Sequence, residues 1–241
     1  MPQTAAGDAL APLTQGVRDR RLAAGLTQRE LAHRLPEPPP RHADPGGRDL
    51  VWCRVLGPLQ VWGPGGEVRL GRPHRQAVLG LLALQPNVVV QRESIIDALW
   101  GEEPPASAVT MIHSYVSQLR KLLPGGRVGK GAELARVGSG YQLRVDIDEL
   151  DLLIFSRQTA RAVRARDGGD LAESFRLFEE ALGLWRGEPL AGIDLLKDHP
   201  AVTALRASRA ATVVDYAEAG RTRAEYEKAI PHLRERPRGS R

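Results

Sequence analysis

The chain has 241 residues, which is enough for one large domain or for two small domains that each bury a core. Its net charge of +5 is confined to one part of the chain, because residues 51–145 carry 11 lysines and arginines against 6 acidic residues. A basic block beside near-neutral segments indicates that one part of the protein meets a polyanion. The single cysteine, Cys53, excludes a disulfide framework and a thiolate metal site, and we expect it to be buried.

No apolar run reaches the roughly 20 residues that a membrane-spanning helix needs. The N-terminus lacks the basic and apolar regions of an export signal. We therefore expect a cytoplasmic protein without a membrane partner.

The N-terminal segment, residues 1–48, is expected to hold a short helical unit and a linker. Residues 17–35 contain two short helical patterns, and the second begins with Thr27 and Glu30 at the spacing of a capping box. Prolines and glycines in residues 34–47 interrupt helix and strand patterns alike. Residues 17–35 resemble the first two helices of a Cro/repressor-type helix-turn-helix without its recognition helix. We expect a remnant that does not read bases alone.

Strands and two helices are predicted between residues 51 and 105. Residues 51–62 alternate as a strand does, residues 63–66 suit a turn, and residues 68–70 can pair back. Pro73 opens a helix, since its missing amide hydrogen is not needed in a first turn, and Pro86 ends that helix. A second helix covers residues 92–100, and Ser107 is placed as the N-cap of a third.

The third helix, residues 107–123, has two chemically different faces. Ile112, Val116, Leu119 and Leu123 form an apolar stripe that is expected to face the core. The opposite face carries short polar groups and a cation, with no carboxylate: Thr110, His113, Ser114, Ser117, Gln118 and Lys121. A helix that lies against phosphates needs this composition, because a carboxylate would repel the backbone. The alternative is a solvated amphipathic helix, although such helices usually mix both charge signs.

A β-hairpin is predicted directly after this helix. Gly138 and Gly140 allow a tight reversal, and Arg136 on the first strand can approach a minor groove. Tyr141 is expected to pack its ring under the hairpin rather than to stack on a base. Strands, three helices and a hairpin, in this order, are the layout of a winged helix-turn-helix.

Five blocks of residues 51–145 resemble, in order and at matching separations, the OmpR-type DNA-binding domain of the actinobacterial antibiotic-regulatory activators called SARPs. The blocks are RVLGPLQVW, RQAVLGLLAL, ESIIDALWG, PPASAVTMIHSYVSQLRKLL and GSGYQL. Residues 146–241 are similar to the bacterial transcriptional activation domain that follows in those proteins. The implied fold is mainly α with a small β component: a winged helix-turn-helix followed by TPR-like antiparallel helical hairpins.

Residues 146–241 agree with this resemblance, because each predicted helix carries one apolar stripe. The stripes are Leu171, Phe175, Phe178, Leu182 and Trp185, then Val202, Leu205, Val213 and Tyr216, then Tyr226, Ile230 and Leu233. Helices of this kind must stack on neighbours, so the aromatic residues are expected to fill a core. The family's domain normally continues further, and we therefore expect this one to be truncated.

The resemblance assigns roles to individual side chains. It makes His113, Ser114, Ser117 and Gln118 the candidates for contacts with base edges, and a glutamine can pair with adenine. Relatives often carry arginine at the position of Gln118, so a different sequence preference is expected. Phosphate contacts are expected from Thr110, Arg120, Lys121, Arg72, Arg75, Arg92 and Lys130. Two alternatives stay open: Arg120 can brace the domain through a carboxylate such as Asp97, and His113 can be merely solvated.

The implied function is binding to direct repeats in promoters, with recruitment of RNA polymerase and activation of an antibiotic biosynthetic cluster. A homodimer on the repeats is compatible with this function. Two other functions compete with it: a truncated competitor that binds without activating, and a helical protein-interaction module. The histidines lack metal-ligand spacing, and Gly129-Lys130 lacks the other residues of a phosphate-binding loop. We therefore expect no cofactor, no metal and no enzymatic activity.

Overall fold

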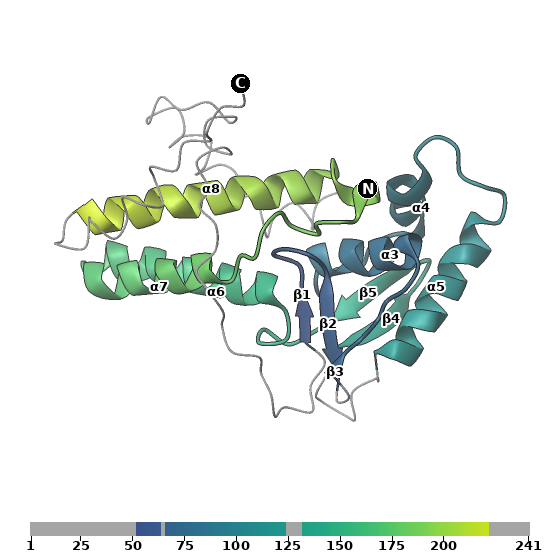
Figure 1. Ribbon diagram of the computed structural model, residues 1–241, viewed down its shortest axis with the longest axis horizontal. Coiled ribbons are helices and arrows are strands. Elements are labelled where there is room, and N and C mark those ends of the chain that lie inside the picture. The colour runs from purple at the N-terminus through teal and green to yellow at the C-terminus, as the bar shows by residue number, and fades with distance from the viewer. Residues whose placement is uncertain (1–51, 64–65, 124–131, 222–241) are drawn as a thin grey trace, which may run out of the picture. The chain divides into compact units, whose positions relative to one another are not determined.

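The computed structural model describes residues 52–63, 66–123 and 132–221 (Figure 1). They form two compact units. The winged-helix unit comprises the described residues up to 154 together with 187–202, and the helical unit comprises 155–186 and 203–221. The two units are not separated by a single boundary at residue 145. Residues 146–154 and 187–202 also belong to the winged-helix unit. The predicted elements in residues 1–48, Lys130 and the apolar stripe from Tyr226 to Leu233 lie outside the described residues.

The winged-helix unit begins with a three-stranded antiparallel sheet, in which β1 (Trp52–Arg54), β2 (Gln60–Gly63) and β3 (Gly66–Glu67) lie in that order. The prediction of one strand over residues 51–62 is wrong in its middle. The backbone amides of Val55 and Leu56 donate to the carboxylate of Asp151, at 2.8 and 3.0 Å, and no strand partner binds them. Cys53 is buried, as predicted.

Three helices follow the sheet: α3 (Pro73–Leu84), α4 (Arg92–Trp100) and α5 (Ala108–Leu122). The predicted starts at Pro73 and Arg92 are confirmed. Ser107 occupies the N-cap position of α5 as predicted, but its side chain forms no capping hydrogen bond. Its hydroxyl group instead contacts the sulfur of Met111 at 3.6 Å.

The predicted hairpin consists of β4 (Glu133–Val137) and β5 (Gly140–Arg144). Val90, between α3 and α4, exchanges two backbone hydrogen bonds with Tyr141, at 2.8 and 2.9 Å. Gly140 makes this approach possible, because a Cβ there would lie 2.5 Å from the carbonyl oxygen of Val90. The hairpin is therefore fixed to the segment that links the first two helices.

Residues 187–202 complete the winged-helix unit from a distant part of the chain. They include the short 3-10 helix η1 (Asp194–Leu196). The amide of Leu190 donates to the carbonyl oxygen of Val55 at 3.1 Å. The side chains of Leu190 and Leu196 lie over Gly80 of α3, where a Cβ would be 3.1 and 3.2 Å from their methyl groups. A glycine in α3 thus lets these leucines close the core of the unit.

The helices α6 (Asp151–Asp167), α7 (Leu171–Gly183) and α8 (Pro200–Arg221) supply the helical unit. Within it, α6 and α7 run side by side (Figure 1). Phe175 stacks on Tyr216 with ring centroids 4.4 Å apart, and Phe155 meets Trp185 edge to face at 5.4 Å. All four rings are buried, which confirms that these aromatic residues fill a core.

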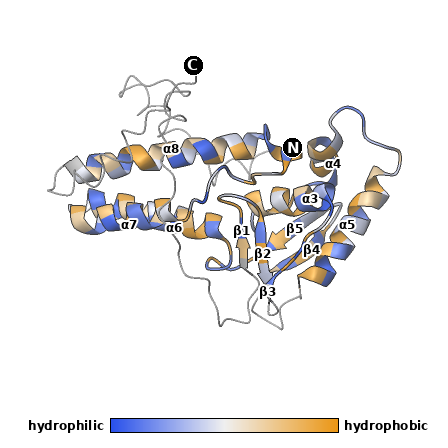
Figure 2. Ribbon diagram, viewed as in Figure 1, coloured by the Kyte–Doolittle hydropathy of each residue, from blue (hydrophilic) through white to orange (hydrophobic). Residues whose placement is uncertain are grey.

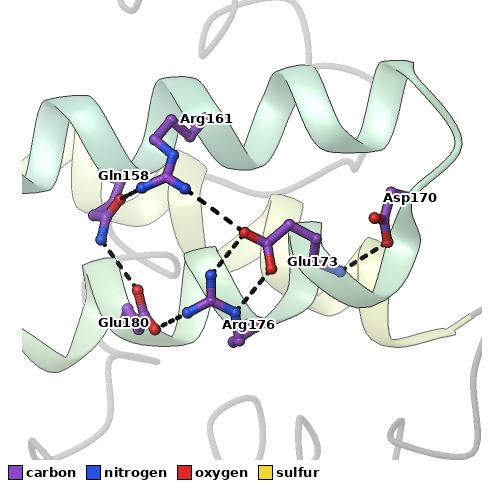
Figure 3. A network of polar contacts seen from close by, with 6 residues as sticks. All are labelled: Gln158, Arg161, Asp170, Glu173, Arg176 and Glu180. Atoms are coloured by element: carbon purple, nitrogen blue, oxygen red, sulfur yellow. Dashed lines mark hydrogen bonds and ion pairs between the residues drawn. The ribbon is translucent and has the colours of Figure 1, made fainter.

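A polar network joins the outer surfaces of α6 and α7 (Figure 3). Figure 3 shows its six members: Gln158, Arg161, Asp170, Glu173, Arg176 and Glu180. Asp170 caps α7 by accepting the amide of Glu173 at 3.0 Å. Arg176 binds Glu173 at 2.6 Å and also Glu180, while Arg161 lies 3.8 Å from Glu173. The hydrogen bond from Arg176 is the largest of the effects that lower the pKa of Glu173.

The described residues are mostly helical with two small sheets, and the expected fold class is confirmed. Among the helices of the described ranges, none is both long enough and apolar enough to cross a membrane.

Candidate nucleic-acid interface

Helix α5 has the two faces that its sequence predicts. Ile112, Val116 and Leu119 are at most 1% exposed, and Tyr115 is also buried. Hydrophobic and hydrophilic residues both occur along α5 (Figure 2). All members of the predicted polar face are exposed: Thr110, His113, Ser114, Ser117, Gln118 and Lys121. The helix therefore presents donors, acceptors and positive charge outward without a carboxylate.

A stack of aromatic rings holds α5 against the other two helices. The ring of His74 on α3 packs against Trp100 of α4 and Tyr115 of α5, with centroid distances of 5.6 and 6.2 Å. His74 and Trp100 are half-buried, and Tyr115 is buried. Because one ring of each helix takes part, the stack fixes the orientation of α5, and so of its exposed side chains.

Gln118 is the best-connected residue on the exposed face. Its Oε1 accepts a hydrogen bond from Nη1 of Arg75 at 2.7 Å, and its Nε2 donates to Oγ of Ser114 at 2.9 Å. Nε of Arg75 donates to the carbonyl oxygen of Leu70. The structure thus brings together two base-edge candidates and one residue that was predicted to bind phosphate.

Arg120 braces the domain, but through a different partner from the one considered. Its Nε donates to the carbonyl oxygen of Leu134 at 2.8 Å, whereas the alternative left open by the sequence was a carboxylate such as Asp97. A backbone acceptor on β4 ties the end of α5 to the hairpin. Arg120 is nevertheless exposed, so its guanidinium group still lies at the surface.

The other predicted phosphate ligands lie in different settings. Arg72 is the exposed N-cap residue of α3, and Lys121 is exposed in the last turn of α5. Arg92 forms an ion pair with Glu93 at 2.7 Å, with side chains 30% and 63% exposed. The pKa of Glu93 is lowered, first by a backbone hydrogen bond and then by Arg92. A neighbouring carboxylate therefore already balances the charge of Arg92.

The hairpin presents Arg136 outward at its end. Its side chain is exposed, and its Nε lies 3.4 Å from the carbonyl oxygen of Gly138. Ser139 donates to the side-chain oxygen of Gln91 at 3.0 Å, which anchors the hairpin to the start of α4. Tyr141 is only 3% exposed, which confirms that its ring packs under the hairpin. The His113 ring meets it edge to face at 6.3 Å, while His113 itself stays exposed.

Two exposed valines belong to this surface and were not among the predicted site residues. Val109 is 37% exposed in the first turn of α5, one turn before His113, and Val137 is 36% exposed at the end of β4. Apolar side chains of this kind can contact the methyl group of thymine. Helical spacing would have found Val109, because it lies four residues before His113 on the polar face.

Within the ranges that the structure describes, no three His, Cys, Asp or Glu side chains gather where they could hold a metal ion.

Two family models match the chain. The model described as "Transcriptional regulatory protein, C terminal" matches residues 65–143, and "Bacterial transcriptional activator domain" matches residues 150–238. The first match contains α3, α4, α5 and the hairpin, and the second contains α6, α7 and α8.

Curated relatives include regulators from two groups of actinobacteria. The chain is 35% identical to the regulatory protein AfsR of Streptomyces griseus, over 62% of this chain and 15% of AfsR. It is 39% identical to the transcriptional regulatory protein EmbR of Mycobacterium tuberculosis H37Rv, over 63% of this chain and 39% of EmbR. For the regulatory protein DnrI of Streptomyces peucetius, the identity is 37% over 58% of this chain and 53% of DnrI.

A solved structure of Mycobacterium tuberculosis EmbR, in complex with a low affinity phosphopeptide, has a similar fold. The TM-score is 0.69 at 34% identity, and the match covers 76% of this chain and 48% of that chain. The chain thus spans about half, or less, of the length of these relatives. Both domain matches, in this order, and these relatives support a SARP-type transcriptional regulator.

Proposed function

We propose that the protein regulates transcription by binding specific sequences of double-stranded DNA, with α5 in the major groove and the β4–β5 hairpin beside it. The observation that carries this proposal is the exposed face of α5, which combines hydroxyl, amide, imidazole and ammonium groups with no carboxylate. Residues 51–145 also carry 11 basic against 6 acidic side chains. Phosphate attraction and base contacts both require such a surface.

The side chains divide into two roles. His113, Ser114, Ser117 and Gln118 are proposed to contact base edges, because they occupy the exposed middle of α5. Phosphate contacts are proposed for four exposed residues, Thr110, Arg120, Lys121 and Arg72, and for the half-buried Arg92, while Arg136 on the hairpin is proposed to approach the minor groove. Base contacts determine specificity, whereas phosphate contacts determine orientation and most of the affinity.

The regulatory output is proposed from the family. The proposed role is activation of an antibiotic biosynthetic cluster through direct repeats in promoters, and the similarity to AfsR and DnrI supports the first part of it. In this scheme the winged-helix unit binds the repeats, as single chains or as a homodimer, and the helical unit recruits RNA polymerase. The helical unit supports this assignment because it matches the bacterial transcriptional activator domain.

Selection of bound sequences from a random pool of DNA duplexes, at two salt concentrations, tests the proposal. We expect one enriched motif and an affinity that falls steeply with salt, because each phosphate contact releases about one counterion. The purified full chain is the protein to use. Absence of enrichment at low ionic strength would reject the proposal and favour a protein-interaction module.

A further inference from the structure

Arg75 and Gln118 form a contact between two helices that has consequences for base recognition. They are 43 positions apart, on α3 and α5, and Nη1 of Arg75 lies 2.7 Å from Oε1 of Gln118. Within α5, Nε2 of Gln118 donates to Oγ of Ser114 at 2.9 Å, one helical turn earlier. Both polar ends of a base-edge candidate are thus engaged by neighbouring side chains.

These partners determine which way the amide of Gln118 faces. A guanidinium group only donates hydrogen bonds, so the atom of Gln118 that meets Arg75 must be the oxygen. The nitrogen then faces Ser114, whose hydroxyl oxygen can accept. Without Arg75, rotation of the amide by half a turn would exchange its donor and acceptor ends, because the last torsion of glutamine has a broad two-fold profile.

Arg75 is itself held in place for this contact. Its Nε donates to the carbonyl oxygen of Leu70, just before α3, and its side chain is half-buried. Gly71 leaves the room for the guanidinium group, because a Cβ at Gly71 would overlap Nη2 of Arg75. Two of the donors of Arg75 are therefore used inside the protein, which sets it apart from the exposed Arg72.

We propose that Arg75 is a positioning residue that sets the base preference of Gln118 by holding its amide in one orientation. This proposal rests on the proposed function, in which α5 enters the major groove. Held in this way, the amide keeps one acceptor site on Oε1 and one donor site on Nε2. These are the two groups that the N6 and N7 edge of adenine requires, so adenine is the expected base.

The test compares affinities for four duplexes that differ only in the base read by Gln118. That position is located first, as the one at which Q118A relaxes the preference. We expect R75A to reduce the discrimination there by at least about fivefold, the lower range for one paired contact, and to leave other positions unchanged. In the Q118A background, R75A should cause no further change at that position. The ratio of the affinities for two duplexes does not depend on the fraction of folded protein, so a partly unfolded variant can still be compared.

The conservative variant R75K and the matched variant R72A sharpen the test. Lysine keeps the positive charge but lacks the planar guanidinium group that bridges Leu70 and Gln118. R75K should therefore relax the base preference at the same position. R72A should lower the affinity for all four duplexes alike. If Arg75 instead binds a phosphate, the pattern is the opposite. R75A should then lower the affinity for all four duplexes by the same factor and lower the salt slope by about one, and R75K should keep the wild-type affinity.

Three results would overturn the proposal. The first is a uniform loss of affinity in R75A, and the second is a Q118A variant that relaxes no position. The third is an effect of R75A on base preference that persists unchanged in the Q118A background. A wild-type protein that enriches no sequence would instead reject the proposed function itself, before any variant is compared.

Discussion

The carboxylate of Asp151, at the start of α6, binds the backbone amide of Val55, 96 positions earlier in the chain, at 2.8 Å. The same carboxylate accepts the amide of Leu56 at 3.0 Å, and Asp151 is only 2% exposed. One buried side chain thus ends β1 and anchors the first turn of α6. Its hydrogen bonds replace those that a longer strand would have made.

Replacing Asp151 should destabilise the winged-helix unit strongly. D151A leaves two buried amides without their acceptor, and we expect a loss of about 2–4 kcal/mol in the free energy of unfolding. Urea unfolding measures this loss. D146A, which removes an exposed carboxylate nearby, should change the stability by less than about 0.5 kcal/mol. Equal effects of the two variants would contradict the role of Asp151.

A side chain at Gly140 should displace the hairpin. The added Cβ of G140A would lie 2.5 Å from the carbonyl oxygen of Val90 and 2.9 Å from a methyl group of Val89. Overpacking of this kind typically costs about 1–3 kcal/mol, measurable by thermal unfolding. Gly138 offers a control, because a Cβ there meets no atom within 4 Å although φ is +59°. Since asparagine tolerates that backbone conformation, G138N should be the milder change.

Neighbouring leucines test whether residues 187–202 belong to the winged-helix unit. Leu196 is fully buried over Gly80, whereas Leu195 is 37% exposed. L196A should lower the free energy of unfolding by about 2–5 kcal/mol, because it opens a cavity in the core. L195A should cost much less, since its side chain already meets solvent. If L196A left the unfolding of the winged-helix unit unchanged, the assignment of this segment would be wrong.

The network of Figure 3 predicts a pH-dependent contribution to the stability of the helical unit. The hydrogen bond from Arg176 lowers the pKa of Glu173 below 4.5, so the ionised pair stabilises the folded state at neutral pH. This contribution is lost as the pH falls through the lowered pKa. R176A should therefore lower the thermal midpoint at pH 7 and have a smaller effect at about pH 3.

A salt titration provides an independent check on that network. The side chains of Glu173 and Arg176 are both partly exposed, so a high salt concentration should also reduce the difference in thermal midpoint between wild type and R176A. R164A, which replaces an exposed arginine on α6, is the control. Its effect on the thermal midpoint should be the same at pH 7 and pH 3. A difference between wild type and R176A that stayed constant from pH 7 to pH 3 would exclude the ion pair as its cause.

Lys121 should contribute to DNA affinity without contributing to specificity. If its ammonium group binds a phosphate, K121A should weaken binding to every sequence by a similar factor. It should also lower the slope of log affinity against log salt concentration by about one. Electrophoretic or fluorescence titrations at several salt concentrations measure both effects. Lys197 is an exposed lysine of the same unit, beside η1, and K197A should leave the slope unchanged. A change of base preference in K121A would assign Lys121 a different role.

Local sequence by itself determined the elements that create the candidate surface. The stripe of Ile112, Val116 and Leu119 is buried, and the polar face between Thr110 and Lys121 is exposed, because helical periodicity reports which side meets the core. The start of α3 at Pro73 follows from proline's fixed backbone angle and missing amide hydrogen, which suit a first turn. Such signals lie within a few residues of one another, so the sequence displays them directly.

Tertiary structure alone decided how those elements are joined. The break after β1 depends on Asp151, the closure of the core depends on Leu190 and Leu196, and the orientation of Gln118 depends on Arg75. In each case the partners are separated by dozens of positions, and no periodic pattern links them. Hydrogen bonds and packing between distant residues form only once the chain has folded, and for this reason periodicity could place Gln118 on a surface but not show what holds it there.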